Sequence, residues 1–174
     1  MSRMPEHLVL LVVQADEAAH APVRAALKGI EGTEYEIHWV TTPRAALAAL
    51  EEHPHDAFLV DRELHEPGHN GLDVAADILA HSPHAPVILL DDHADRVTDL
   101  AATEMGVSDY LVHPSPATLE RSLRYAITHQ RGEKYSLSAR TSQSHRPSLA
   151  PWSASAWRSS DSASRRSAVW WVIA

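Results

Sequence analysis

The sequence predicts an α/β fold in which helices cover both faces of a five-stranded parallel sheet. Short apolar runs alternate five times with longer segments of helical period between residues 7 and 131. The first run, residues 7–14, is almost uninterrupted, as is typical of a strand that is buried on both faces. The chain has 174 residues, of which 44% are hydrophobic, and this is enough for one core of ordinary size. We therefore expect one doubly wound domain followed by an appendage.

Each strand and helix has its own local signal. The apolar runs that predict strands are residues 7–14, 35–40, 57–60, 85–90 and 110–112. The segments of helical period that predict helices are residues 17–28, 43–50, 71–79, 95–105 and 116–129. Asp16 is the expected N-cap of the first helix, and Gly29 lies at its end. Thr41 or Thr42 is expected to cap the second helix, which begins with proline.

Charge and residue usage exclude several classes of protein. The formal net charge of -8 is uneven, because residues 132–174 carry six basic and two acidic residues and the preceding ones nine basic and 21 acidic. A body this acidic is unsuited to a phosphate backbone, so we expect no nucleic-acid binding by it. The absence of cysteine excludes disulfides, thiolate zinc sites and cysteine nucleophiles. Without a long apolar run or a signal peptide, the chain is expected to be cytoplasmic and free of membrane contacts.

Residues 132–174 differ in character from the rest of the chain. They are rich in Ser, Arg and Trp, with 12 serines and four of the five tryptophans, and they show no period. Such a segment cannot bury enough apolar surface to offset its ordering entropy, so we expect a disordered tail. Its end, residues 168–174, is apolar and prone to β structure, and could dock on the body. An alternative origin of the tail is a reading-frame change or an engineered junction.

Polar residues gather where the strands are expected to end, which is the edge at which open parallel sheets place their functional sites. These residues are Gln14, Ala15, Asp16 and Glu17 after the first strand, Asp61 after the third, Asp91 and Asp92 after the fourth, and His113 after the fifth. Neighbouring carboxylates repel one another unless a cation, a proton or a hydrogen-bond donor compensates them. N-capping is an alternative role that suits Asp16, which precedes a helix, better than Asp61, which precedes a loop.

The order and spacing of several motifs resemble the receiver domain of two-component response regulators over residues 5–131. The motifs are Phe-Leu-Val-Asp at 58–61, Gly-His-Asn-Gly-Leu-Asp-Val at 68–74, Pro-Val-Ile-Leu-Leu at 86–90, Gly-Val-Ser-Asp-Tyr-Leu-Val-His-Pro at 106–114, and residues 119–127. The resemblance implies a flavodoxin-like three-layer sandwich with strand order 2-1-3-4-5. It also implies that a histidine kinase transfers a phosphoryl group to Asp61. Because nothing after residues 124–131 resembles a catalytic motif, we expect the chain not to be a stand-alone enzyme.

The metal site implied by this resemblance is incomplete. In receivers an acidic pair after the first strand holds Mg²⁺ together with the acceptor aspartate and a backbone carbonyl. Gln14 and Ala15 stand where that pair is expected. A shift of the first strand by one residue would bring Asp16 and Glu17 into use, so a Mg²⁺ site would consist of Asp16 and Asp61.

The phosphate-binding and switch positions also depart from the family pattern. Asp91 replaces the Ser or Thr hydroxyl and cannot donate a hydrogen bond while it is ionised. His113 replaces the lysine and is fully charged only when it is protonated. Tyr110 matches the family's aromatic switch, which moves inward when the hydroxyl residue is drawn to the phosphate. With Asp91 present, this coupling is expected to be weakened or fixed in one state. Asp61, Asp91 and His113 could instead form an internal ion pair in place of a metal.

Two functions are therefore open. The first is a phosphorelay receiver that accepts a phosphoryl group on Asp61. The second is a phosphorylation-independent receiver, or a truncated receiver from a multidomain sensor kinase or cyclic-dinucleotide enzyme, that acts through protein contacts. In either case a histidine kinase, another signalling protein or a second copy would bind the face of the fourth helix, fifth strand and fifth helix. A ligand-binding flavodoxin-like domain is disfavoured, because no Gly-rich or Ser/Thr-rich phosphate loop follows the first strand.

Histidine is frequent, with 13 residues, of which 12 precede Gly132. Three pairs lie at short spacing, namely His53 with His55, His65 with His69, and His81 with His84. Imidazoles beside carboxylates can bind zinc or nickel. Because no pair belongs to a segment with four convergent ligands, we expect these histidines to be solvated surface residues.

Overall fold

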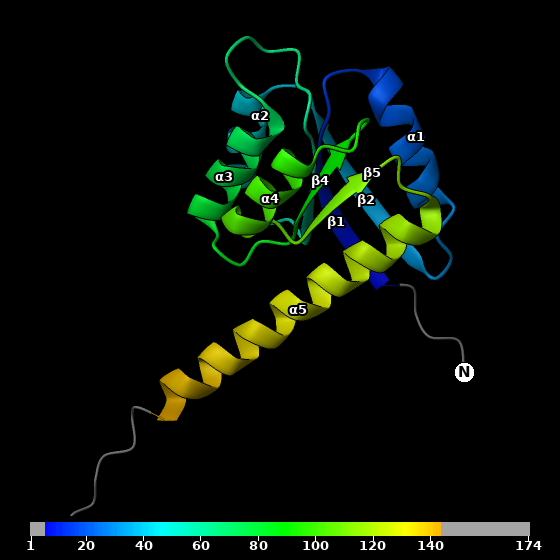
Figure 1. The fold of residues 1–174 in the computed structure, drawn as a ribbon. Coiled ribbons are helices and arrows are strands. Elements are labelled where there is room, and N and C mark those ends of the chain that lie inside the picture. Colours follow the sequence, from blue (N-terminus) through cyan, green and yellow to red (C-terminus); the bar gives the residue numbers. More distant parts are fainter. Residues whose placement is uncertain (1–5, 144–174) are drawn as a thin grey trace, which may run out of the picture.

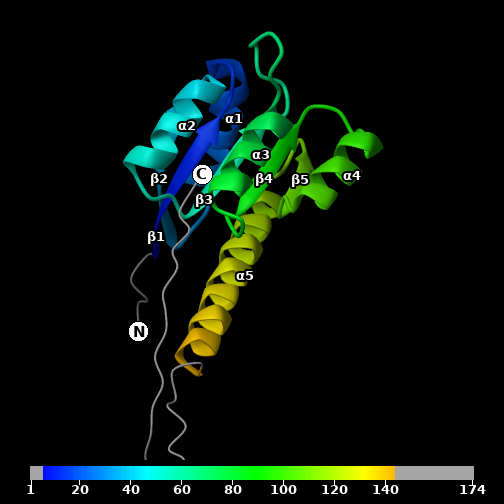
Figure 2. The same cartoon turned by 90° about the vertical axis from the view of Figure 1, so that its left-hand side faces the viewer.

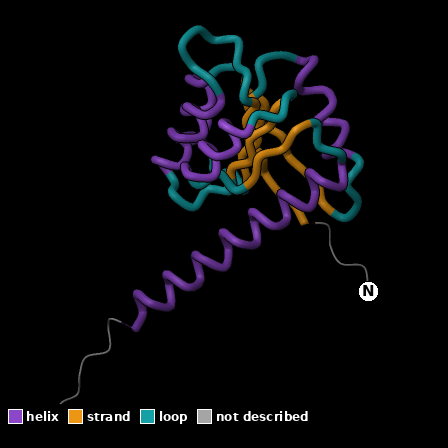
Figure 3. The backbone as a smooth tube through the Cα atoms, in the orientation of Figure 1, coloured by secondary structure: helices purple, strands orange, loops and turns teal. Residues whose placement is uncertain are grey.

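Five parallel strands form the central layer of the molecule, in the order β2-β1-β3-β4-β5. The computed structural model describes residues 6–143. The strands are β1 (Glu6–Val13), β2 (Thr33–Val40), β3 (Ala57–Asp61), β4 (Val87–Asp91) and β5 (Asp109–Val112). Figure 3 shows them as one sheet enclosed by helices. The doubly wound fold and its strand order are those that the sequence and its family resemblance predicted.

Five helices form the two outer layers. They are α1 (Glu17–Lys28), α2 (Pro43–Glu52), α3 (Gly71–His81), α4 (Arg96–Met105) and α5 (Pro116–Gln143). α1 and α5 cover one face of the sheet, and α2, α3 and α4 cover the other (Figures 1 and 2). The predicted caps are present, because the Asp16 side chain accepts from the Ala19 amide and the Thr42 side chain accepts from the Ala45 amide.

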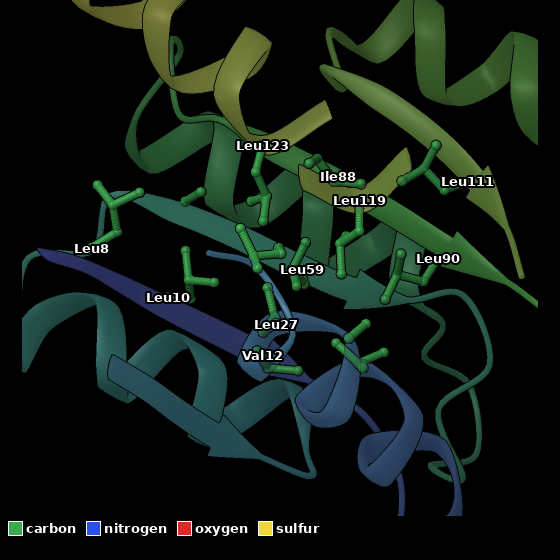
Figure 4. Packing of buried hydrophobic residues seen from close by; sticks show 14 of the residues in the cluster. Leu8, Leu10, Val12, Leu27, Leu59, Ile88, Leu90, Leu111, Leu119 and Leu123 are labelled. Atoms are coloured by element: carbon green, nitrogen blue, oxygen red, sulfur yellow. The ribbon is translucent and has the colours of Figure 1, made fainter. Parts of the chain in front are cut away.

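Alternating side chains of the strands fill two separate cores. Val12, Leu59 and Leu90 belong to the core beneath α1 and α5 (Figure 4). Val13 and Leu89 belong to the core beneath α2, α3 and α4. This alternation continues to the strand ends and decides which face of the sheet each functional side chain reaches.

α5 is longer than the sequence predicted. Its predicted end is residue 129, with a tail from residue 132, but the helix continues through Gln143 and extends beyond the sheet (Figures 1 and 2). A helix that is already nucleated on the core propagates at little cost, and residues 133–140 include the helix-favouring Glu, Lys, Leu, Ala and Arg. Residues 144–174, the remainder of the predicted disordered tail, lie outside the described residues.

The other boundaries differ from the prediction by one or two residues. β1 ends at Val13 rather than Gln14, which places Gln14 just beyond the strand. β4 begins at Val87 rather than Ala85, because Pro86 has no amide hydrogen to donate to a sheet. Over the described part of the chain, no helix is both long and apolar enough to cross a bilayer.

Candidate functional site at the carboxyl edge of the sheet

A cavity of about 470 Å³ lies where the strands end. Its polar lining consists of Gln14, Asp16, Asp61, Glu63, His65, Asp91, Asp92 and His113. Residues from α1 and the start of α5 supply an apolar wall, among them Ala19, Pro22 and Leu119. The structure therefore brings most of the predicted site residues to one place. Among the described residues that line the cavity there is no lysine or arginine.

Asp61 ends β3 and is partly buried at this cavity. Its Oδ1 accepts a hydrogen bond from the Glu63 amide at 3.2 Å. Burial raises the pKa of the Asp61 carboxyl above its ordinary value, and the charges of Asp92 and Asp91 raise it further. Hydrogen bonds from the Glu63 amide and the Gln14 side chain oppose this rise. No lysine or arginine of the cavity lining therefore compensates the Asp61 carboxylate.

Gln14 is buried, and its side-chain amide and its backbone carbonyl both form hydrogen bonds. Its Nε2 donates to the Ala19 carbonyl at 3.0 Å, and its Oε1 lies 3.3 Å from Nδ1 of His20. The Trp39 indole N–H donates to the Gln14 carbonyl at 3.1 Å, and the Trp39 ring stacks on His20 with centroids 4.4 Å apart. Sequence reasoning treated Gln14 only as a missing acid and missed His20 and Trp39. The sequence signal for this interaction was His20, which lies on the buried face of α1.

Asp16 serves as the N-cap of α1. Its Oδ1 accepts the Ala19 amide at 3.0 Å, while Oδ2 lies 3.9 Å from Nδ1 of His65. Ala15 lines the cavity without contributing a polar side chain. An amide and a methyl group therefore stand in place of the acidic pair of the family pattern, and the residue after them, Asp16, is a helix cap.

Asp91 points away from Asp61 and toward the α2–α4 side of the sheet. Its side chain is 0% exposed, and its neighbour Leu90 belongs to the opposite core. The Tyr110 hydroxyl donates to Asp91 Oδ2 at 2.6 Å, and Nε of Arg62 lies 3.6 Å from the same oxygen. The His93 amide donates to Oδ1 at 3.0 Å. Donors and a guanidinium thus compensate the Asp91 carboxylate from within the chain.

Tyr110 connects this carboxylate to the start of α4. Its hydroxyl accepts the Asp95 amide at 3.3 Å and lies 2.9 Å from the His93 carbonyl. Burial and the hydrogen bond to Asp91 raise the pKa of Tyr110 to about 12. Arg62 reaches Asp95 as well, with 4.0 Å between its Nη2 and Oδ2. Sequence reasoning missed Arg62, although a single arginine directly after the candidate acceptor was a visible signal.

His113 does not join Asp61 and Asp91, so the predicted internal ion pair of these three residues is absent. The His113 side chain is 70% exposed, with Nδ1 3.8 Å from Asp92 Oδ1. Its backbone has φ 44°, and its amide donates to the Asp91 carbonyl at 3.3 Å. The tight turn after β5 directs the imidazole toward the rim of the cavity. Arg62, rather than His113, is the cation beside Asp91.

The predicted Mg²⁺ ligands Asp16 and Asp61 both line the cavity, and Asp16 also caps α1. The Gln14 oxygen faces His20. Within residues 6–143, no three His, Asp or Glu side chains are arranged to hold a metal.

His53 and His55, one of the three histidine pairs at short spacing in the sequence, lie near a third histidine, His38. The Nδ1 atom of His38 is 3.0 Å from Nε2 of His55.

The structure is a doubly wound α/β domain with a cavity outside the strand carboxyl ends and an aspartate, Asp61, at the end of its central strand β3. Residues 10–124 match the model of the response regulator receiver domain, and the chain belongs to this family. It is accordingly a receiver domain of two-component signalling. A comparison with curated protein sequences gave no significant match.

Several solved structures of receiver domains have the same fold as this chain. One, from a modulated diguanylate cyclase of Desulfovibrio desulfuricans G20, is 26% identical over 74% of this chain and 99% of its own, with a TM-score of 0.63. A second, from a sensor histidine kinase of Pseudomonas aeruginosa PAO1, is 25% identical over 70% and 98%, with a TM-score of 0.60, and has a magnesium ion coordinated in its active-site cleft. A CheY-like receiver from Methanospirillum hungatei JF-1 is 22% identical over 74% and 99%, with a TM-score of 0.62.

Proposed function

We propose that this receiver domain signals through protein contacts of a fixed α4–β5–α5 face and that phosphorylation of Asp61 is not its input. One observation carries the proposal: Tyr110 is bonded to the buried Asp91 carboxylate, which Arg62 compensates. In the family mechanism, a hydroxyl at the Asp91 position is free to move toward a phosphoryl group. An ionised Asp91 would be repelled by that group and is already held on the other side of the sheet.

The chemistry of the cavity supports the same function. Phosphoryl transfer requires positive groups that stabilise charge on the transferred oxygens. Burial raises the pKa of Asp61, and the charges of Asp92 and Asp91 raise it further. The nearest substitute for the family lysine, His113, is exposed and faces Asp92. A phosphoryl group on Asp61 would therefore add negative charge to a site that lacks compensation.

The alternative is a phosphorelay receiver in which Asp61 accepts a phosphoryl group from a histidine kinase. The position of Asp61 at the end of β3, facing the cavity, favours it. This alternative would need a cation and a donor supplied from outside the chain. The proposal and the alternative both describe a cytoplasmic signalling module that is not a stand-alone enzyme.

The α4–β5–α5 face carries exposed apolar side chains, which are typical of protein-binding surfaces. Val97 and Leu100 on α4 are 75% and 53% exposed, and Tyr125 on α5 is 67% exposed. A histidine kinase, another signalling protein or a second copy would meet this face. The Tyr110 hydroxyl of β5 is bonded to Asp91 and to the Asp95 amide before α4, and we infer that these bonds hold the face in one conformation.

Intact-mass spectrometry after incubation with acetyl phosphate and Mg²⁺ tests the proposal. We expect no phosphoryl adduct on the parent or on Asp61→Asn, with circular dichroism showing that both are folded. A receiver domain with a complete pocket, treated in parallel, controls for the activity of the phosphodonor. An adduct on the parent that is lost in Asp61→Asn would refute the proposal and establish the alternative.

A further inference from the structure

Histidines and a glutamate gather at the edge of the sheet that β2 forms. His38 of β2 has its Nε2 3.0 Å from Glu36 Oε1 and its Nδ1 3.0 Å from Nε2 of His55, which lies in residues 53–56, the α2–β3 segment. The His55 ring is 5.8 Å from the ring of Phe58 in the core. The prediction of a solvated surface histidine is therefore wrong for His55, which is partly buried and joins this segment to the edge strand.

The protons in this chain of contacts are assigned by the chemistry of the groups. An ionised carboxylate can only accept, so Nε2 of His38 must carry the proton that faces Glu36. Neutral His38 then has a bare Nδ1, and Nε2 of His55 must donate to it. Neutral His55 is left with a bare Nδ1, and this buried atom has no hydrogen-bond partner among the described residues. The His38–His55 contact thus holds one proton between two neutral rings.

A further proton does not fit this contact. On Nδ1 of His38 it would face the N–H of His55 across 3.0 Å, and on Nδ1 of His55 it would create a buried donor without a partner. Burial lowers the pKa of the His55 imidazole, and the charges of His38 and His53 lower it further. A weaker interaction with the His53 backbone and the charge of Asp56 oppose this lowering. The closed contact therefore favours the neutral rings.

Glu36 and Asp56 flank the contact on its two sides. The hydrogen bond from His38 lowers the pKa of the Glu36 carboxyl, so Glu36 stays ionised and can compensate an imidazolium; its Oε2 also lies 3.5 Å from Nε2 of His7 on β1. The Asp56 amide donates to the Val9 carbonyl at 2.7 Å, and Asp56 Oδ2 accepts the Val9 amide at 2.9 Å. The α2–β3 segment is thus held on the sheet by two neighbouring sets of contacts, one of which can titrate.

We propose that the His38–His55 contact is a proton-operated switch that holds the α2–β3 segment on β2 while both rings are neutral and releases it when one more proton binds. The proton comes from solvent and converts one imidazole to an imidazolium. Since β2 and β5 form opposite edges of the sheet, the switch is separate from the α4–β5–α5 face (Figure 2). It goes beyond the proposed function, because it gives the domain a response to acid that needs no phosphoryl group on Asp61.

The protonation states of the two rings in the parent are the first test. Two-bond ¹H–¹⁵N NMR of the histidine-labelled full chain reports which ring nitrogen carries the proton, and His38→Gln and His55→Phe assign the signals. We expect both rings to be protonated on Nε2 near neutral pH, and His55 to titrate below the ordinary histidine pKa of about 6.5. A proton on Nδ1 of His55 near neutral pH, or its titration at or above about pH 6.5, would overturn the inference.

Hydrogen exchange of the Asp56 amide measures the release itself. Because the folded-state pKa of His55 is lowered, the closed contact is fully stable above about pH 6.5 and loses stability as the pH falls. After correction for the intrinsic exchange rate, we expect protection in the parent to fall by at most about tenfold per pH unit below this value, the slope of a one-proton step. His55→Phe keeps a ring beside Phe58 and should lose most of this pH dependence.

His81→Phe makes the same replacement at an exposed position of α3 and should behave as the parent. Equal pH dependence in the parent and in folded His55→Phe would contradict the switch. If His55→Phe does not fold, His38→Gln removes the imidazole from the other side of the contact, and an unchanged pH dependence there would be equally contradictory. Neither measurement uses a phosphodonor, so a phosphoryl adduct would refute the proposed function and leave this inference standing.

Discussion

The hydroxyl of Tyr110 connects β4, β5 and the start of α4 through hydrogen bonds. It donates to Asp91 at the end of β4, accepts from the Asp95 amide before α4, and belongs to β5. Arg62 adds a guanidinium on the far side of the Asp91 carboxylate. Removing one member of such a buried group leaves the others without partners, which costs about 1 to 3 kcal/mol. We expect Tyr110→Phe to destabilise the fold by this amount at neutral pH.

The titration of Tyr110 gives a prediction at alkaline pH. Its folded-state pKa is raised to about 12, whereas an unperturbed tyrosine ionises near pH 10. Because the folded state favours the neutral phenol, the stability from this shift is complete below about pH 10 and is lost as the pH rises to about 12. We expect the free energy of unfolding to fall more steeply over this interval in the parent than in Tyr110→Phe.

Urea denaturation at a series of alkaline pH values measures this difference. Tyr125→Phe is the control, because the Tyr125 side chain is 67% exposed and removing its hydroxyl should leave the slope of the parent unchanged. If the parent and Tyr110→Phe lost stability equally between about pH 10 and 12, Tyr110 would not be held as the structure shows.

At the scale of elements, α3 begins in direct contact with the strand that carries Asp61. A Cβ atom on Gly71 would lie 2.0 Å from the Asp61 carbonyl oxygen, and the Gly71 amide donates to the Arg62 carbonyl at 2.8 Å. Both neighbours are backbone and cannot rotate away. We expect Gly71→Ala to destabilise the domain by about 3 kcal/mol or more and to displace Asp61.

Gly132 provides the matched glycine on α5. A Cβ atom there would meet nothing within 4 Å, and the residue lies inside the helix. Because alanine favours a helix over glycine, we expect Gly132→Ala to stabilise the helix by about 0.5 to 1 kcal/mol. Thermal and urea denaturation compare the two variants. Similar effects of both substitutions would contradict the close contact at Gly71, and a destabilising Gly132→Ala would contradict the extension of α5.

At the scale of the whole molecule, the fixed α4–β5–α5 face predicts association that does not depend on a phosphodonor. Leu100 and Val97 are the exposed apolar side chains of α4. With a second copy as the partner, we expect Leu100→Ser to weaken self-association about tenfold or more, with the same result with and without acetyl phosphate. Light scattering across a concentration series measures this. Leu47→Ser, on α2, is the control.

A dimer that forms only after phosphodonor treatment would contradict the fixed face. So would a dimer that Leu47→Ser disrupts and Leu100→Ser does not, because the contact would then lie on α2 rather than α4. An unassociated parent would leave the face to a different signalling protein and exclude the second copy.

The family and the layer architecture were predictable from sequence. Apolar runs such as residues 7–14, separated by segments of helical period, determine a parallel sheet that is covered on both faces. The N-caps at Asp16 and Thr42 also followed from local signals, since capping depends on a few neighbouring residues. Asp61 was placed correctly at the end of β3, because the strand and its first polar residue are adjacent in the chain.

The sequence by itself therefore determined the family, the layers and the residues that gather at the carboxyl edge. Only the tertiary structure decided how those residues pair. Strand alternation sends Asp91 toward Arg62 and Tyr110 rather than His113, and register brings Gln14 beside Asp61. The extension of α5 to Gln143 likewise depends on the packing of its first turns on the core, which periodicity alone does not predict. Periodicity is a local property of the chain, whereas the partner of a side chain depends on distant segments that folding brings together.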